Sequence, residues 1–327
     1  MWNTKTIALM LKGLAMGIAE SIPGVSGGTI AFITGIYEKL LEAIKSITPR
    51  NIMMVRQGFG PFWKAIQGPF LLVLGVGMFI GLGLGVSIIA YLLENQQEAL
   101  WALFFGIVLA SIGYIGKDIG WDVKSILFAI AGGAISYWIT TISPSGGSEN
   151  ALYVFLGAAV AISATMLPGI SGGFILLLLG LYHTIILAFR DVISLNFNAS
   201  SITLLIFAAG MLTGLFTFTR LVSYFFKNHY RLTIATMTGV LAGSLNKLWP
   251  WKVIDRVYEK SSGKILNINT TQLSSSDDYK IIQESNVSPE TFARYSDPHY
   301  VYVIGAFILG LVLVLLLSRF SPKNKED

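Results

Sequence analysis

One eight-residue loop occurs twice in this chain, each time inside apolar sequence. Residues 22–29 read IPGVSGGT and residues 167–174 read LPGISGGF. Proline and paired glycines break helices, and broken backbone at membrane depth needs protein or water to satisfy its polar groups. Two such breaks in corresponding halves of a chain are typical of a transport site. We therefore predict helix breaks at Pro23, Gly24, Pro168 and Gly169.

The repetition continues beyond the loop. Gly77 and Tyr91 return as Gly210 and Tyr224 at a constant offset of 133 residues. Chance matches between Gly-rich and Ala-rich segments do not keep one offset over so long a stretch. We therefore divide the chain into a first repeat (1–120), a linker span (121–149), a second repeat (150–248), a polar insert (249–299), and a last span with its tail (300–327).

Composition places these repeats in a membrane. Hydrophobic residues make up 54% of the chain and charged residues 13%, with a mean hydropathy of +0.66, whereas a soluble domain carries about 25% charge. The chain has no cysteine and three scattered histidines, so neither a disulfide nor a metal site is expected, and no cofactor is indicated. We attribute the net charge of +5 to basic loops that set membrane topology, and not to nucleic-acid binding.

The pattern predicts an all-α integral membrane protein. Each repeat would contain a hairpin broken by the motif loop and two transmembrane helices, while a linker helix and a C-terminal helix complete the fold. The helix after the first loop spans about 14 Å, about half of the hydrocarbon core. This favours re-entrant hairpins with Tyr37 near a membrane interface; fully spanning hairpins are the alternative. Each hairpin returns the chain to the side of the membrane on which it started, whereas the linker crosses the membrane once. The two repeats would therefore have inverted topology.

Basic residues indicate the orientation. The loops that this topology places on one side contain most of the Lys and Arg residues, whereas the opposing short loops contain Arg190 alone. The positive-inside rule then places both termini in the cytoplasm and the insert outside. Residues 45–68 form a basic amphipathic connection that we expect along the membrane surface.

The motif loops suit an anion. Successive backbone N–H groups converge where glycine accepts the required angles, and the N-terminus of the following helix adds partial positive charge. The predicted substrate-binding residues of the two loops are Ser26, Gly27, Gly28, Thr29, Ser171, Gly172 and Gly173. The alternative is that the glycines serve only close helix packing.

Two ionisable residues within the predicted spans are further candidates for substrate binding. Glu20 precedes the first loop, and Thr165 stands at its place in the second copy. Helix capping or a proton-linked role is the alternative for Glu20. Arg220 lies in the predicted span 202–226, and arginine is the preferred side chain for bidentate phosphate contact. The alternative for Arg220 is that it extends to the cytoplasmic surface.

Residues 19–29 and 35–38, with the second copy at 167–173, resemble the PopT-type polyprenyl-phosphate transporters of bacteria. The resemblance covers nearly the whole chain apart from the insert. It implies a flippase of the cytoplasmic membrane that returns undecaprenyl phosphate from the outer to the inner leaflet. The implied partners are this polyprenyl-phosphate lipid, membrane lipids, and a coupling ion, either a proton or sodium; the oligomeric state is not indicated.

Two other functions fit the residues without the resemblance. A soluble-anion channel or exchanger would also direct helix ends at an anion, and a membrane scaffold would use the glycines for packing alone. An enzyme is not expected, because the sequence has no metal-spaced histidines, no Walker lysine after the glycines, and no Ser-His-Asp set.

Overall fold

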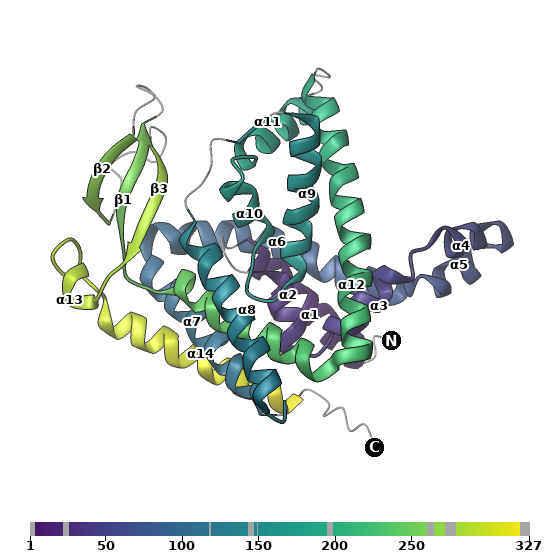
Figure 1. Cartoon of the computed structure of the whole chain (residues 1–327), viewed down its shortest axis with the longest axis horizontal. Helices are drawn as coiled ribbons and strands as arrows, with labels where there is room; N and C mark the ends of the chain where they lie inside the picture. Colours follow the sequence, from purple (N-terminus) through teal and green to yellow (C-terminus); the bar gives the residue numbers. More distant parts are fainter. Residues whose placement is uncertain are drawn as a thin grey trace.

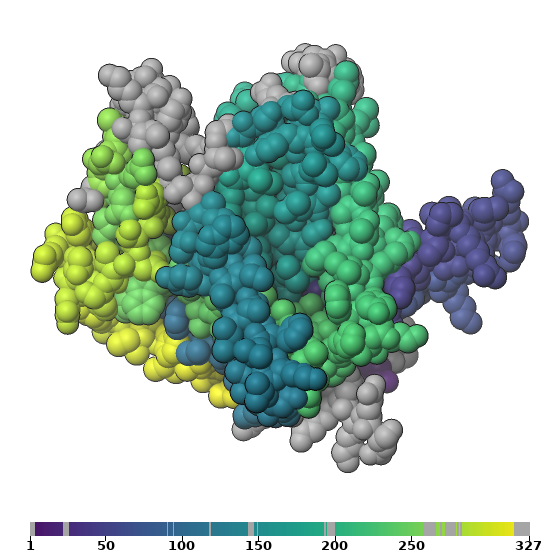
Figure 2. Space-filling view, viewed as in Figure 1, coloured from purple at the N-terminus to yellow at the C-terminus, as the bar shows by residue number. Residues whose placement is uncertain are grey.

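The computed structural model describes residues 4–21, 26–117, 119–142, 147–148, 150–194, 199–259, 265–271 and 279–320. The predicted breaks at Pro23 and Gly24 lie outside these residues. Helices form a central body, from which a small β-sheet and a helical arm project on opposite sides (Figure 1). The arm is also clear of the body in the space-filling view, at the right of Figure 2.

The first repeat and the linker contain the helices α1 (Thr4–Glu20), α2 (Gly27–Ile33), α3 (Tyr37–Lys45), α4 (Pro49–Met53), η1 (Met54–Gln57), α5 (Phe59–Ala65), α6 (Gly68–Asn95), α7 (Gln97–Gly116) and α8 (Val123–Thr141). The projecting arm consists of α4, η1 and α5. It exposes Ile52, Met53 and Phe59 together with basic side chains, which is the amphipathic composition expected of a segment on a membrane surface.

The second repeat contains α9 (Ala151–Met166), α10 (Gly172–Leu178), α11 (Tyr182–Ile193) and α12 (Ala199–Ser244). The chain then continues through η2 (Leu245–Leu248), β1 (Lys252–Glu259), β2 (Ile265–Thr270), β3 (Tyr279–Asn286), α13 (Pro289–Phe292) and α14 (Tyr300–Phe320). Backbone angles at His229 (φ −140°, ψ 45°) break α12. The two predicted spans, 202–226 and 232–248, are the arms on either side of this break.

By length and composition, four helical segments among the described residues are suited to cross a membrane: Gly68–Leu93, Gln97–Gly116, Val123–Thr141 and Ser200–Leu248. The number is five if α10 and α11, which meet at 110°, are counted as one broken span or re-entrant loop. The 49 residues of the last segment would measure about 73 Å as a straight helix, more than twice the thickness of the hydrocarbon core. The break at His229 therefore has to divide it.

The same helix packing occurs in both repeats. In the first, α1 packs against α6 so closely that a Cβ added at Gly77 would overlap the Met10 carbonyl oxygen. In the second, α9 packs against α12, and a Cβ at Gly210 would overlap the Phe155 carbonyl oxygen. One turn later the same relation joins Gly81 to Leu14 and Gly214 to Ala159. Residues paired by sequence repetition thus make equivalent contacts, since small residues let helix backbones approach.

The bend that ends each short motif helix is also repeated. Gly35 after α2 has φ +69°, and Gly180 after α10 has φ +67°. Each glycine amide, and the amide that follows it, donates back to a carbonyl of the preceding helix at 2.9–3.2 Å. This is a glycine C-terminal cap, which only a residue without Cβ adopts at low cost. Local sequence therefore turns the chain in the same way in both hairpins.

The all-α prediction is wrong for the polar insert. Residues 252–286 contain a three-stranded antiparallel sheet with the order β2-β1-β3. The central strand β1 buries Val253, Ile254 and Val257, and β-branched residues suit a pleated, half-buried surface. The segment is too polar to enter a membrane, but its apolar residues are sufficient to hold three short strands together.

Candidate functional site

The two motif regions meet at the centre of the molecule through hydroxyl groups of the first repeat. Ser26 Oγ donates to the Thr165 carbonyl at 2.6 Å, and the Tyr37 hydroxyl donates to the Met166 carbonyl at 2.6 Å. These carbonyls belong to the last turn of α9, where no helical amide is available to them. We name these two bonds, together with the one described next, the central joint.

The third bond of the central joint runs in the opposite direction. The Gly169 amide donates to Thr29 Oγ1 at 2.8 Å. Helix α9 ends at Met166 and α10 begins at Gly172, so the predicted break at Pro168 and Gly169 falls between them. Gly169 has φ +89°, a left-handed conformation that favours glycine. The joint therefore depends on the local backbone of the second loop as well as on hydroxyls of the first.

The first motif loop is capped by the side chain of Glu20. Glu20 Oε2 accepts from the Gly27 amide at 2.7 Å, and Ser26 Oγ accepts from the Gly28 amide at 3.0 Å. The Thr29 amide donates to the Ser26 carbonyl at 3.0 Å. The first turn of α2 is thus fully paired within the chain, and Glu20 takes the Gly27 amide that was predicted to bind substrate. In this conformation Glu20 acts as a helix cap.

The second motif loop has no such carboxylate. Thr165 replaces Glu20, and its hydroxyl donates to the Ala161 carbonyl at 3.1 Å. Ser171 makes no capping bond to α10. Among the described residues, none provides an acceptor for the amides of Gly172 or Gly173. The two loops therefore differ. Glu20 caps the first loop, whereas the Gly172 and Gly173 amides of the second loop have no acceptor among the described residues.

The glycines at the start of the two motif helices do not use the backbone angles that are special to glycine. Gly27, Gly28, Gly172 and Gly173 all have negative φ, because they form the first turns of α2 and α10. Three of the four are tightly packed. A Cβ at Gly28 would lie 2.7 Å from the Thr165 carbonyl oxygen, and one at Gly172 would lie 2.5 Å from the Ala161 carbonyl oxygen. Beside Gly173 the nearest atom, Ser171 Oγ, is 3.7 Å away.

A cavity of about 280 Å³ opens on one side of the central joint. Its lining includes Tyr37, Glu38, Tyr114, Tyr230 and Arg231. We name it the arginine cavity. Tyr37 lies between this cavity and the joint, since it lines the cavity and its hydroxyl reaches the Met166 carbonyl. Tyr37 is only 3% exposed, because its ring packs between Phe32 and Phe226 inside the protein; its position near a membrane interface stays a prediction.

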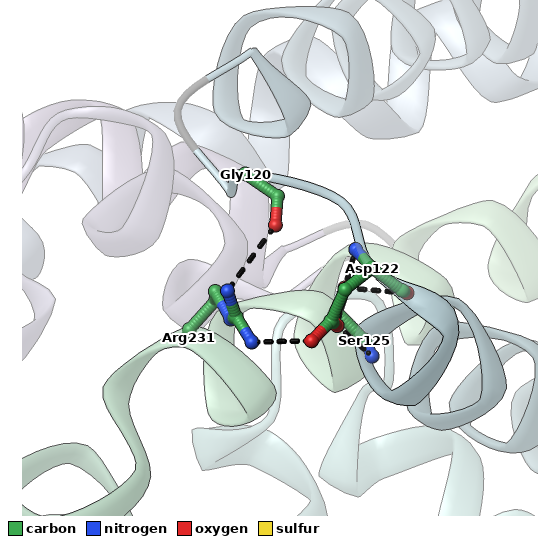
Figure 3. Close-up of polar contacts among 4 residues, drawn as sticks. All are labelled: Gly120, Asp122, Ser125 and Arg231. Carbon is green, nitrogen blue, oxygen red and sulfur yellow. Dashed lines mark hydrogen bonds and ion pairs between the residues drawn. The ribbon is translucent and has the colours of Figure 1, made fainter.

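Arg231 is held at the mouth of this cavity by the start of α8 (Figure 3). Its guanidinium pairs with Asp122 at 2.5 Å and donates to the Gly120 carbonyl at 3.5 Å. Asp122 caps α8 through reciprocal bonds with Ser125. The Ser125 amide and hydroxyl, and then the Arg231 charge, hold the pKa of Asp122 below its usual value. The cavity therefore presents a positive group whose position is set by an ionised partner.

A second, much smaller pocket lies on the other side of the joint. It has a volume of about 10 Å³ and is lined in part by Ser136, Gly169, Ser171, Phe174 and Lys247. We name it the lysine pocket. Such a volume is the room of a single water molecule. The space in the arginine cavity is therefore much larger than the space in the lysine pocket.

Helix α8 gives the distance between the arginine cavity and the lysine pocket, because residues near its two ends belong to these two spaces. Asp122, which holds Arg231, precedes its first turn, and Ser136 lies in its last third. At the α-helical rise this interval is about 21 Å, a large part of a hydrocarbon core of about 30 Å. The arginine cavity and the lysine pocket therefore lie toward opposite ends of the linker helix, with the central joint between them.

Arg220 makes no hydrogen bond to the residues of the joint among the described contacts. Its side chain is exposed and donates to the Phe216 carbonyl of its own helix at 2.9 Å. The neighbouring Thr219 is buried and donates to Met166 Sδ at 3.4 Å. Thr219 thus lies on the buried face of α12, and Arg220 lies on the exposed face. Phosphate contact by Arg220 stays a prediction, and it requires a different conformation of the protein.

Sequence reasoning did not identify Tyr37, Met166 or Lys247 as residues of the site. Tyr37 gave a signal, since Tyr182 repeats it in the second copy, but Tyr182 is 47% exposed and the symmetry does not extend to the contact. Met166 participates through its carbonyl, which any residue possesses. Lys247 lies beyond the motif loop by more than 70 residues, so only the fold brings it near.

The fold and the site define a class: a multi-pass helical membrane protein in which two repeated, helix-broken hairpins join at a buried polar centre. The profile of the undecaprenyl phosphate translocase-like family matches residues 16–266. The chain belongs to this family.

Two relatives support the assignment. A polyprenyl-phosphate transporter of Vibrio cholerae serotype O1 is 34% identical over 321 residues, which are 97% of each chain. A polyprenyl-phosphate transporter of Staphylococcus aureus is 32% identical over 256 residues, which are 74% of this chain and 85% of that protein. No solved structure matches the chain.

Proposed function

We propose that this protein is a translocase that returns undecaprenyl phosphate from the outer to the inner leaflet of the bacterial cytoplasmic membrane. The observation that carries the proposal is the central joint, where two motif loops meet between an open cavity and a nearly closed pocket. Relatives named as polyprenyl-phosphate transporters supply the substrate class.

The substrate needs such a polar centre. A phosphate monoester carries about −1.5 to −2 charges near neutral pH, and moving that charge through hydrocarbon without compensation is prohibitive. The polyprenyl tail stays in lipid while the head group crosses. The protein therefore needs polar groups at mid-membrane that are reached from one side at a time.

The orientation follows from the basic loops. With both termini in the cytoplasm, the arginine cavity opens inward and the lysine pocket faces the outer leaflet. The conformation is then the inward-open one. The repeated packing of α1 on α6 and of α9 on α12 supports two equivalent repeats, and the single linker span between them would give them inverted topology. Single-cysteine labelling of Asn95 and Asn228 tests this, because inversion requires the two positions to react from opposite sides of the membrane.

Transport then requires the central joint to part and re-form. The phosphate is held by Ser171 and the open amides of Gly172 and Gly173, and afterwards by the first loop when Glu20 leaves the Gly27 amide. A proton that neutralises Glu20 would release this amide, which makes Glu20 the residue of choice for coupling to a proton. Arg220 would contact the phosphate in the outward conformation.

The test uses purified protein in liposomes that contain undecaprenyl phosphate. Head-group accessibility to a phosphatase added outside is followed with time, with protein-free liposomes as the control. Exchange of the lipid between leaflets, together with restored growth of cells depleted of carrier recycling, is the expected result. Chloride flux without lipid exchange would support the soluble-anion channel, and neither activity would support the scaffold.

A further inference from the structure

Lys247 lies next to the second motif loop. It belongs to η2, which follows α12, and its Nζ is 5.1 Å from the centre of the Phe174 ring. Phe174 is the residue after Gly173 and belongs to the first turn of α10. Lys247 also lines the lysine pocket together with Ser171 and Gly169. A cation and a motif hydroxyl thus share one small space.

A buried hydroxyl in the same pocket lacks a partner. Ser136 is 1% exposed, and its Oγ has no hydrogen-bond partner among the described residues. A buried polar atom left unpaired is costly, and such an atom in a membrane transporter is a reason to look for a ligand. The wall that contains it is tied to η2, since Asn246 Nδ2 donates to Thr140 Oγ1 at 2.7 Å.

The β-sheet of the insert controls the position of Lys247. Glu284 on β3 lies 3.5 Å from Lys247 Nζ, and the two side chains are 22% and 27% exposed, respectively. Lys252 on β1 donates to the Lys247 carbonyl at 2.7 Å, and Asn286 donates to the Asn246 carbonyl at 2.8 Å. The sheet therefore supplies both a carboxylate that neutralises Lys247 and two side chains that hold its backbone.

We propose that Lys247 binds the phosphate at the second motif loop and that Glu284 pairs with Lys247 when no substrate is bound; this inference rests on the proposed function. A lysine is a point charge suited to phosphate. A phosphate monoester, with about −1.5 to −2 charges, outcompetes the single charge of a carboxylate. The pocket of about 10 Å³ does not accommodate the phosphate until Glu284, and the sheet with it, moves away. The insert is then a cover that substrate displaces.

The experiment measures undecaprenyl phosphate binding to the full-length protein in detergent. Lys247→Ala is expected to weaken binding by about tenfold or more, as for loss of one charge-assisted contact, whereas Lys247→Arg retains most of it. Glu284→Gln is expected to tighten binding, because it removes the competing carboxylate. Lys227→Ala, at an exposed lysine next to the break in α12, is the matched control and is expected to bind as the wild type does.

The Glu284 variant separates binding from stability. If Lys247 and Glu284 only support the fold, both variants lose binding together, and this result overturns the inference. Unchanged affinity in Lys247→Ala, in a protein whose wild type binds the lipid, overturns the inference alone. A wild type that binds no undecaprenyl phosphate overturns the proposed function and this inference with it.

Discussion

Adjacent glycines of the second motif loop offer a direct test of binding against packing. A Cβ at Gly172 would overlap Thr165 Oγ1 and lie 2.5 Å from the Ala161 carbonyl oxygen. A Cβ at Gly173 would have Ser171 Oγ as its nearest neighbour, at 3.7 Å. The substitutions Gly172→Ala and Gly173→Ala add the same methyl group one residue apart. They differ only in what that methyl group meets.

The expected magnitudes follow from these contacts. Overpacking against backbone costs about 1–3 kcal/mol, so Gly172→Ala should lower stability by that amount. Gly173→Ala meets open space and exchanges glycine for a better helix former, worth up to about 1 kcal/mol. Because the gain in helix propensity applies to both positions, the two variants should differ by the overpacking cost of about 1–3 kcal/mol, with Gly173→Ala at least as stable as the wild type.

Transport gives the second readout. If the open amides of Gly172 and Gly173 receive the phosphate, a side chain at Gly173 blocks its approach. Gly173→Val should then lose transport of undecaprenyl phosphate in liposomes, although it remains folded. Thermal midpoints in detergent and transport rates are measured on the same preparations. Normal transport by Gly173→Val would refute phosphate binding at this loop and leave packing as the role of its glycines.

Further substitutions test the joint, the remaining arginine and the buried lysine. Thr29→Val keeps the side-chain shape but leaves the Gly169 amide without its acceptor, at a cost of about 1–3 kcal/mol; an unchanged thermal midpoint would contradict this. Arg220→Lys should retain some transport and Arg220→Ala almost none at matched expression, while full transport by Arg220→Ala would mean that the residue serves only the surface. Burial lowers the pKa of Lys252 to about 7 from 10.5, against the opposing charge of Glu284. The unfolded chain therefore binds more protons than the folded protein between about pH 7 and 10, so wild-type stability should rise by about 1.4 kcal/mol per pH unit across that range, and Lys252→Met should remove this slope in pH-dependent unfolding.

Features that depend only on residues adjacent in the sequence were predictable from the chain. The helix break at Pro168 and Gly169 and the matching bends at Gly35 and Gly180 follow from the intrinsic conformational preferences of proline and glycine. The sheet in the insert was missed. Its polar residues dominated the composition, whereas the three buried residues of β1 that stabilise it are visible only when the strands pair.

The state of the two loops required the tertiary structure. Near-identical sequences, at 22–29 and 167–174, differ because Glu20 closes one and Thr165 leaves the other open. The sequence showed that these two residues correspond, but not that the Glu20 carboxylate reaches the Gly27 amide. The same holds for Arg220, whose direction depends on which face of α12 the neighbouring helices cover.

Hydropathy, a constant repeat offset and the properties of proline and glycine are local or periodic, so the membrane class, the repeat and the break at Pro168 and Gly169 could be predicted from the chain alone. The contacts of Ser26 with Thr165, of Tyr37 with Met166 and of Glu284 with Lys247 could be found only in the folded protein. These contacts join residues far apart in the chain. Their distances result from how two glycine-packed hairpins and a small sheet dock together, and a single sequence carries no record of that docking.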